Sequence, residues 1–544
     1  MNRAKVSPDD RSITSGSDFL QLNIDDAPSG GRSDWLAARL RLAISDGRLP
    51  IGGRLPATRV LAGELRVSRG VVTEAYQRLI EDGHVVGRGR AGTVVVAAPE
   101  TVPMVAPPVP TGSPSGPTGP SLPGTAGPPS ARALFGAAPG ADVFDALRAI
   151  PARIDLSPGV PDLTAFPRTA WLRAERAVLS DLAASALGYG DPRGTPELRL
   201  AVANWLARNR GIRADPGEVL IVSGTAQALG LLTQVLRHDG IGEVAVEDPG
   251  SLGTRQHLHN WQVDTPPIPV DSEGIRVDEL RAQGAPAVLL TPAHQFPTGV
   301  VLGGERRREL ARWAGAGGLI IEDDYDAEHR YDRPPVPALR SMLAEHVCYA
   351  GSVSKLLAPA LRVGWVLAPS KYRDALVDAK RFADLGNAVL PQLVLARLME
   401  SGELERRLRL LRRRHRLRRD AMIDAIRTHL PGAVVHGAAA GLHLMITLGA
   451  GFADVDLAAA SLARGVKVQP LSWHSQRPSR PGLVLGYAAS TPSDIAEGVA
   501  IIGTLLRGPC RRRTPAENRR ETGPAGDRSY GAGRRAAPGA FDHF

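Results

Sequence analysis

Short apolar runs in the second half of the chain each end in a group of polar residues. Between about Ile154 and Arg507 these runs alternate with longer helical patterns, which is typical of a parallel sheet with crossover helices. The carboxyl ends of parallel strands meet at one edge of an open α/β sheet, where such sheets bind ligands. We therefore expect an α/β domain with a ligand site at that edge. The runs and the polar groups that follow them are Val219–Val222 with Ser223–Thr225, Val244–Val246 with Glu247–Gly250, Val288–Leu290 with Thr291–Gly299, Leu319–Ile321 with Glu322–Asp326, and Cys348–Ala350 with Gly351–Lys355.

A Pro/Gly-rich segment divides the chain of 544 residues. From Pro99 to about Gly140 it is dominated by Pro, Gly, Ser, Thr and Ala, so it cannot bury enough apolar surface to order itself. The chain is also too long for one ordinary core, so a multi-domain protein is expected. The predicted parts are a disordered N-terminus at 1–17, a compact domain at 18–98, a flexible linker at 99–150, the α/β domain at 151–507 and a basic disordered tail at 508–544.

The charge balance is basic, with 66 Lys and Arg against 56 Asp and Glu and a net charge of +10. This suits a polyanionic partner, although Arg is abundant throughout and part of the excess lies in the tail. The two cysteines, Cys348 and Cys510, make neither a disulfide framework nor a zinc site, so we expect no metal and a reducing compartment. The charged N-terminus is no secretory signal, and no run is apolar enough to span a membrane. We therefore expect a cytoplasmic, nucleoid-associated protein with no membrane partner.

Three short helices and a hairpin are predicted within 18–98. Leu36, Leu40 and Ile44 are spaced by four residues, as on one face of a helix. Ser68 is a natural N-cap for the third helix, and two short β-runs flank a Gly-rich turn at 87–92. This order defines a winged helix-turn-helix, an α+β fold that binds DNA. The apolar residues expected in the second and third helices are Val60, Leu61, Leu65, Val72, Ala75, Tyr76, Leu79 and Ile80.

The polar side chains of this domain suit double-stranded DNA. Arg69 and Thr73 lie on the leading turns of the third helix, outside its apolar stripe, where they would face the major groove. Arg can bond a guanine edge through two hydrogen bonds or grip a phosphate. Arg88 and Arg90 at the tip of the wing would reach the minor groove or the backbone. A single solvated Arg is the common alternative, so the ordered combination carries the prediction.

The order of residues in this domain resembles the GntR family of bacterial regulators. The matching positions are Leu55–Arg59, Leu61–Ala62, Val67–Arg69, Ala75–Tyr76, Leu79, Asp82–Gly83 and Gly92–Thr93. The resemblance implies contacts with operator DNA at Arg59, Ser68, Arg69 and Thr73, and in the wing at Gly89. Gly70 departs from the small polar residue that is commoner at its position, which puts a base contact there in doubt.

The polar groups of the α/β domain suit an aldehyde that carries a phosphate. Ser223–Thr225 opens a predicted helix, so its N–H groups and a hydroxyl can hold phosphate. Ser352 and Arg362 flank Lys355 and add a hydroxyl and a fixed positive charge, which favours a neutral, nucleophilic amine. An acid of the pair Asp323–Asp324 can keep a pyridinium nitrogen protonated. Each group alone has an ordinary explanation, and their order decides the prediction.

That order resembles the fold-type I aminotransferase family over about 350 residues, and closely its regulator branch, the MocR subfamily of GntR proteins. The resemblance implies pyridoxal 5'-phosphate as the cofactor and a homodimer formed through this domain. It also implies that the domain senses pyridoxal phosphate or an amino compound. The matching strings are Phe166–Pro167, Tyr189–Gly194, Thr291–Pro292, His294–Gly299, Glu322–Asp326, Ser354–Lys355 and Pro359–Gly364.

The resemblance assigns individual roles as well. Lys355 would form the internal aldimine, and Tyr325 would bond the ring oxygen. Asp323 would pair with the pyridine nitrogen, with Asp324 as the second candidate. The remaining implied ligands are His294 or Gln295 at the ring oxygen, Tyr189 near the phosphate bound by the partner subunit, and Gly224, Thr225, Ser352 and Arg362 at the phosphate.

Two departures from the pattern bear on catalysis. Ser251 stands where the regulator branch usually has an aromatic residue over the cofactor ring. No arginine lies in the last predicted strand, Leu483–Tyr487, where aminotransferases hold the substrate carboxylate; Arg477 and Arg480 precede it. Three hypotheses follow: a regulator, an active aminotransferase carrying a DNA-binding domain, and a DNA-binding dimer whose large domain has no cofactor. Lys355 with its phosphate set argues against the third, and the missing anchor argues against the second.

One further segment is unusually basic. Glu403–Arg419 is predicted to be an Arg-rich helix with Leu404, Leu408 and Leu411 on one stripe. A solvated face is the expected role of its arginines. A second DNA-contacting surface is the alternative.

Overall fold

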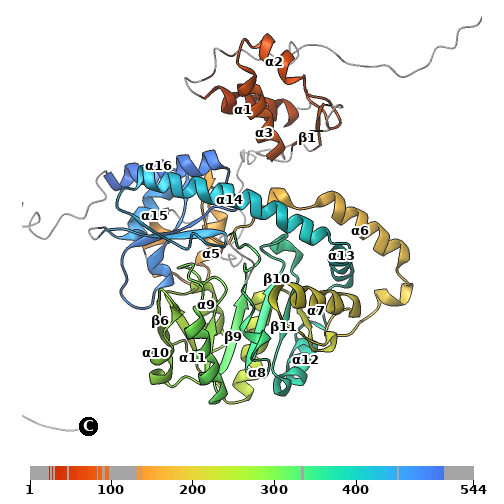
Figure 1. The fold of residues 1–544 in the computed structure, drawn as a ribbon, viewed down its shortest axis with the longest axis vertical. Coiled ribbons are helices and arrows are strands. Elements are labelled where there is room, and N and C mark those ends of the chain that lie inside the picture. The colour runs from red at the N-terminus through yellow and green to blue at the C-terminus, as the bar shows by residue number, and fades with distance from the viewer. Residues whose placement is uncertain are drawn as a thin grey trace, which may run out of the picture. The chain divides into compact units, whose positions relative to one another are not determined.

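The computed structural model describes residues 24, 27, 31–45, 48–81, 84–87, 92–96, 131–136, 138–331, 336–449 and 452–507. The chain divides into two compact units, a small N-terminal one and a large one that begins at Ala126 (Figure 1). The predicted disordered ends at 1–17 and 508–544 lie outside the described residues, as does most of the predicted linker.

The N-terminal unit consists of helices and a hairpin, in the predicted order. Helices α1 (Arg32–Ser45), α2 (Thr58–Glu64) and α3 (Arg69–Glu81) precede the antiparallel strands β1 (Val85–Gly87) and β2 (Thr93–Val95). The predicted apolar positions form its core, apart from Val60, which is 50% exposed, and Ile80, which is partly buried. The predicted winged helix-turn-helix is confirmed.

The second half of the predicted linker is not a linker. Helices α4 (Ala131–Gly136) and α5 (Val143–Ala149) belong to the large unit, where Phe135 and Leu147 are buried in its core. The ring of Phe135 stacks on that of Trp473 with centroids 5.0 Å apart. The prediction of a linker over 99–150 is therefore wrong beyond residue 130. A few apolar residues on two short helices are enough to dock this segment, although Pro and Gly dominate its composition.

The large unit is centred on an eight-stranded sheet. Its middle strands run parallel, as predicted, but β11 runs antiparallel to both of its neighbours. In spatial order the strands are β4 (Leu220–Val222), β11 (Gly364–Leu367), β10 (Val347–Ser352), β9 (Leu319–Asp324), β8 (Ala287–Leu290), β5 (Val244–Asp248), β6 (Pro267–Asp271) and β7 (Gly274–Ile275).

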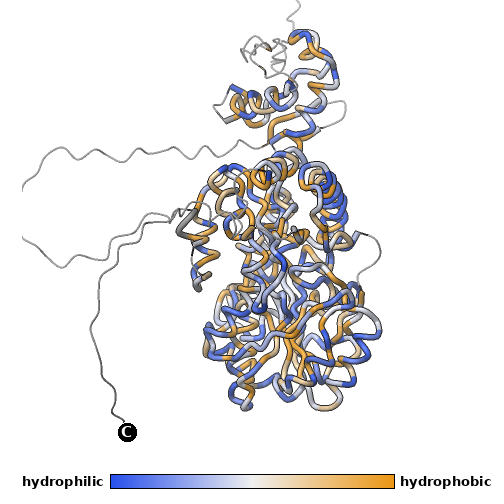
Figure 2. Tube along the Cα trace, turned by 90° about the vertical axis from the view of Figure 1, so that its left-hand side faces the viewer, coloured by the Kyte–Doolittle hydropathy of each residue, from blue (hydrophilic) through white to orange (hydrophobic). Residues whose placement is uncertain are grey.

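Both faces of this sheet are covered by helices, because its strands are apolar on both sides. In β9, Leu319 and Ile321 face one core cluster and Ile320 faces the other. The first cluster includes α8 (Thr225–His238), α9 (Leu252–Asn260) and α12 (Ser370–Asp384); the second includes α10 (Val277–Gln283) and α11 (Gly304–Gly315). Figure 2 shows the hydrophobic strands running through the interior of this unit.

A smaller antiparallel sheet forms a second layer of the large unit. Its strands are β12 (Val434–His436), β13 (His443–Thr447), β16 (Gly482–Gly486) and β15 (Gln469–Pro470), in that spatial order. A parallel pair, β3 (Ile154–Asp155) and β14 (Val466–Lys467), lies in the same core. The remaining helices are α6 (Arg168–Asp181), α7 (Pro196–Arg210), α13 (Val389–Glu400), α14 (Glu403–His429), α15 (Asp454–Ala463) and α16 (Pro492–Arg507) (Figure 1).

Candidate functional site

The predicted phosphate residues meet where β4 and β10 end and the antiparallel β11 begins. Ser352 at the end of β10 pairs with Gly364 of β11, and Gly364 pairs with Val222 at the end of β4. A Cβ on Gly364 would lie 3.0 Å from the Cα of Gly224 and 2.8 Å from the carbonyl oxygen of Gly351. Since a side chain would not fit there, glycine allows these strand ends to approach closely.

A helix N-terminus and a guanidinium complete this corner. Gly224, at a φ of 79°, precedes α8, which begins at Thr225. Arg362, at a φ of 51°, donates a hydrogen bond to the carbonyl oxygen of Ser223, and its Nη1 lies 3.1 Å from where a Cβ on Gly224 would stand. Helix N–H groups and an arginine together suit a phosphate dianion. The structure thus brings together Gly224, Thr225, Ser352 and Arg362.

Asn387 is a member of this corner that the sequence did not reveal. Its Nδ2 donates to Ser223 Oγ at 3.0 Å and to the carbonyl oxygen of Arg362 at 3.2 Å. These bonds tie the turn before α8 to the residue that carries the guanidinium. Asn387 lies 164 residues from Ser223 in the sequence, so no local pattern could have predicted the contact.

Lys355 lies in the turn after β10 with its amine directed at another loop. Its Nζ donates to the carbonyl oxygen of Gly159 at 2.5 Å, and a Cβ on Gly159 would stand 3.3 Å from that nitrogen. Burial lowers the pKa of Lys355, and it stays lowered although the carboxylates of Asp326 and Asp323 act to raise it. A lowered pKa favours the neutral amine, the form that attacks an aldehyde.

Asp323 has the environment that a ring-nitrogen partner needs. Its side chain is 9% exposed, and Oδ1 has no hydrogen-bond partner among the described residues. Burial, then the charge of Asp324, raises the pKa of Asp323 to about 7. An unpaired buried acceptor costs about 1–3 kcal/mol. A protonated pyridine nitrogen would remove that cost, so the residues present fit pyridoxal phosphate.

The two neighbouring aspartates differ in their hydrogen-bond partners. Successive side chains of a strand point to opposite faces, so Asp324 faces away from Asp323. Its Oδ2 accepts from Arg210 Nε at 2.5 Å and from the hydroxyl of Tyr349 at 2.6 Å. Arg210 already neutralises this carboxylate, which leaves Asp323 as the candidate for the ring nitrogen.

The residues predicted to contact the ring oxygen include a buried, hydrogen-bonded group. The Tyr325 hydroxyl lies 3.0 Å from His294 Nδ1, which is also 3.0 Å from Asp326 Oδ2. Burial, then Asp326, raises the pKa of Tyr325 well above its usual value, so the phenol keeps its proton. Gly441 packs on the imidazole, because a Cβ there would lie 1.9 Å from His294 Cε1. The close packing fixes the ring that positions Tyr325.

Gln295, the alternative to His294, has no free hydrogen-bonding group. Its Nε2 donates to the carbonyl oxygens of Pro249 and Phe296, at 2.8 and 2.7 Å. Its Oε1 accepts from the backbone N–H and the hydroxyl of Thr298, at 3.0 and 2.6 Å. The geometry corrects the prediction that Gln295 contacts the cofactor: its side chain joins two loops, and His294 remains as the candidate.

Tyr189 and Ser251 are placed differently from the other predicted residues. Tyr189 is 94% exposed, as a residue that contacts a partner subunit would be in a single chain. Ser251 caps α9, with its Oγ accepting from the backbone N–H of Thr254 at 3.2 Å. A Cβ on Gly253 would lie 3.6 Å from the ring of Phe144, so α5 packs near the first turn of α9.

The arginines before β16 do not replace the missing carboxylate anchor. Arg477 Nε lies 3.8 Å from Asp248 Oδ2, and its guanidinium donates to the carbonyl oxygen of Pro267. Arg480 is exposed. Neither residue lies in the strand where the anchor was expected.

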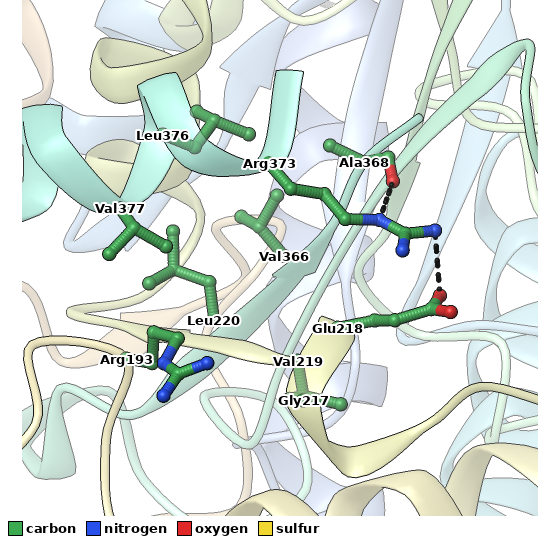
Figure 3. Close-up of a pocket in the computed structure, with 10 residues that line it drawn as sticks. All are labelled: Arg193, Gly217, Glu218, Val219, Leu220, Val366, Ala368, Arg373, Leu376 and Val377. Atoms are coloured by element: carbon green, nitrogen blue, oxygen red, sulfur yellow. Dashed lines mark hydrogen bonds and ion pairs between the residues drawn. The ribbon is translucent and has the colours of Figure 1, made fainter. Parts of the chain in front are cut away.

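A small pocket at the edge of the large sheet is not this site (Figure 3). It lies between β4, β11 and α12, and none of the predicted cofactor residues lines it. Its volume of about 20 Å³ holds roughly one water molecule. Arg373 in this pocket pairs with Glu218 at 3.1 Å and donates to the carbonyl oxygen of Ala368, so its charge is already compensated.

The predicted DNA-contacting residues of the N-terminal unit lie on one end of α3 and on α2. Ser68 Oγ accepts from the backbone N–H of Val71 at 3.4 Å, which is the predicted N-cap. Arg69 Nε donates to Thr58 Oγ1 at 3.4 Å, which links the first residue of α3 to the first residue of α2. Arg59, Ser68, Arg69 and Thr73 are all exposed; Arg88, Gly89 and Arg90 lie outside the described residues.

Comparison with known proteins agrees with both units. Residues 152–502 match the aminotransferase class I and II family, and residues 33–95 match the bacterial regulatory proteins of the gntR family. The chain is 30% identical over 473 residues to the probable rhizopine catabolism regulatory protein MocR of Rhizobium meliloti, covering 85% of this chain and 91% of that one. It is 32% identical over 498 residues to the HTH-type transcriptional regulator TauR of Rhodobacter capsulatus, covering 88% and 98%.

Among solved structures, the kynurenine aminotransferase of Pyrococcus horikoshii matches with a TM-score of 0.62 at 26% identity, covering 67% of this chain and 93% of that one. Fold and site therefore define a helix-turn-helix transcription regulator with a fold-type I aminotransferase domain for pyridoxal phosphate. The chain belongs to the MocR subfamily of GntR regulators. Every described helix is too short or too polar to cross a membrane.

Proposed function

We propose that the large domain of this regulator senses pyridoxal phosphate, or an amino compound that reacts with it, and that the result changes how the protein binds operator DNA. The observation that carries the proposal is that the site combines Lys355, whose pKa is lowered, with Asp323, whose buried Oδ1 has no hydrogen-bond partner among the described residues. The same chain has a DNA-binding unit. When bound, the cofactor supplies an aldehyde for amines and an electron-accepting ring.

We expect no efficient transamination by this domain. An aminotransferase orients its substrate through a fixed cation, and β16, at Gly482–Gly486, contains none. The lysine and the aspartate alone still permit a slow transamination half-reaction, which is the second candidate activity. A spectrum of the protein mixed with an amino acid, without a keto acid, distinguishes a persistent complex from conversion to the amine form of the cofactor.

The direct test of sensing is a DNA-binding titration with the full-length protein. Promoter DNA from beside its own gene would be titrated with the protein in three states: free of cofactor, saturated with pyridoxal phosphate, and saturated with added amines. We expect affinity or footprint to differ between states. Equal affinity and footprint in all states would contradict sensing and leave the large domain with an architectural role.

Arg69→Ala is expected to lower specific DNA affinity by about 1–3 kcal/mol if the side chain bonds a base. The reason is its exposed position at the start of α3, beside the Ser68 cap. Arg39→Ala on α1 removes the same charge from an exposed residue that contacts Trp35, and serves as the matched control. Competition assays with operator and unrelated DNA measure both. Equal affinities for Arg69→Ala and the control would overturn the placement of the recognition helix.

We propose a homodimer formed through the large domain. Tyr189 at 94% and Leu187 at 65% exposure leave apolar surface uncovered on the loop before α7. The mass of the holoprotein at micromolar concentration, measured by light scattering, should be twice that of one chain, and the operator should contain two half-sites. A monomeric mass would contradict the proposal.

A further inference from the structure

Helix α14 is hydrogen-bonded to the segment that follows Asp323 and Tyr325, two of the candidate cofactor residues. Its inner face buries Leu404, Leu408 and Leu411, the stripe expected from the sequence. Arg412 Nε donates to the carbonyl oxygen of Glu328 at 2.6 Å, and Arg416 donates to that of Tyr331. These carbonyls belong to the loop that follows Asp323 and Tyr325, so the position of the helix is fixed relative to the cofactor site.

The outer face of the same helix carries a row of arginines, in which Arg406 pairs with Glu403 at 2.6 Å and Arg416 is the residue bonded to Tyr331. Arg406, Arg409, Arg413 and Arg416 are exposed and follow one another at intervals of three, four and three residues, so they form one stripe. Arg409 and Arg413 make no hydrogen bond or ion pair with any described residue. We call these four residues the α14 arginine stripe.

On two other helical segments of this domain, surface arginines are paired with nearby carboxylates. On α11, Arg308 and Arg312 both pair with Glu305. On α14 itself, Arg427 pairs with Asp424 beyond the stripe. Two adjacent unpaired guanidinium groups repel each other, and a polyanion relieves this repulsion.

We propose that the α14 arginine stripe is a second DNA-contacting surface, which binds the phosphate backbone of operator DNA. The proposal rests on the regulator function. At 1.5 Å per residue the stripe is about 15 Å long, enough to face several phosphates of a duplex. Arginines that contact phosphates add affinity and position the DNA, and they carry no sequence preference.

The test is the salt dependence of DNA binding by full-length protein saturated with pyridoxal phosphate. Arg409→Ala/Arg413→Ala should weaken binding roughly tenfold at low salt, with a smaller loss as salt rises, and should reduce the slope of log affinity against log salt by about 2. Operator and unrelated DNA should lose the same factor. The matched control is Arg308→Ala/Arg312→Ala, which removes two charges at the same spacing from α11. Its slope should equal that of the unsubstituted protein.

Two results would overturn the proposal. An unchanged slope in Arg409→Ala/Arg413→Ala would make the stripe a solvated face, and an equal loss in the α11 control would show an effect of net charge alone. Mass and cofactor absorbance of each variant verify its assembly, and a monomeric Arg409→Ala/Arg413→Ala protein would place a second copy of the chain on the stripe instead. Failure of the regulator function is distinguishable, because then the unsubstituted protein would not bind promoter DNA.

Discussion

Replacing Lys355 by alanine is expected to abolish covalent attachment of pyridoxal phosphate. The amine is buried, its pKa is lowered, and it is held at 2.5 Å from the carbonyl oxygen of Gly159. Noncovalent binding should persist more weakly, because the corner formed by Gly224, Thr225, Ser352 and Arg362 does not involve the lysine side chain. The purified unsubstituted protein should be yellow.

Borohydride provides the measurement, since it reduces the carbon–nitrogen double bond between a lysine and the cofactor aldehyde and makes the attachment permanent. Peptide mass analysis should then find the cofactor on Lys355 in the unsubstituted protein and on no peptide of Lys355→Ala. Lys371→Ala, which removes an exposed lysine from α12, is the control and should retain the adduct. An unsubstituted protein that gives no adduct at Lys355 when saturated with cofactor would mean that the large domain has lost this chemistry.

Replacing Arg210 by methionine is expected to lower the free energy of unfolding of the large domain by about 3–5 kcal/mol. The side chains of Arg210 and Asp324 are 0% and 1% exposed, so the substitution leaves a buried carboxylate without its cation. Asp324 also raises the pKa of Asp323, and an uncompensated Asp324 would strengthen that effect. Weaker cofactor binding should therefore accompany the loss of stability.

Urea unfolding of the cofactor-free protein, followed by tryptophan fluorescence, measures the change. Arg208→Met is the matched control on α7: this arginine is 54% exposed and pairs with Glu405 on the surface, so the loss should stay below about 1 kcal/mol. Adding Asp324→Asn to Arg210→Met should restore part of the stability because it removes the stranded charge. Equal midpoints for Arg210→Met and Arg208→Met would refute this account of the buried pair.

The meeting of the candidate site residues could be predicted because they lie at or just after strand ends. A parallel sheet gathers those ends at one edge, so the order of Ser223–Thr225, Asp323 and Ser352–Lys355 along the chain already implied their meeting in space. Helix capping also depends on nearby residues. The hydroxyl of Ser68 can accept a hydrogen bond from the first turn of a helix, so the start of α3 could be predicted from the sequence. These features depend on neighbouring residues or on the general geometry of sheets.

What the sequence did not reveal depends on distant contacts. Gly159 meets Lys355 across 196 residues, and nothing near either residue marks the contact. The sequence around Gln295 would be the same whether its amide bonded a ligand or joined two loops. Only the three-dimensional structure shows that it bonds the loops of Pro249 and Thr298. The docking of α5 could not be predicted from composition, because its seven residues follow a long stretch that is rich in Pro and Gly.

Helices α4 and α5 are the first described elements of the large unit, and α5 carries a charge that acts on the cofactor lysine. Burial is the main reason why the pKa of Lys355 is lowered, and the charge of Arg148 on α5 adds to it. Phe144 on the same helix packs edge-on against Trp473. Reciprocity follows from thermodynamics: if an effector changes operator affinity by some factor, operator DNA changes effector affinity by the same factor.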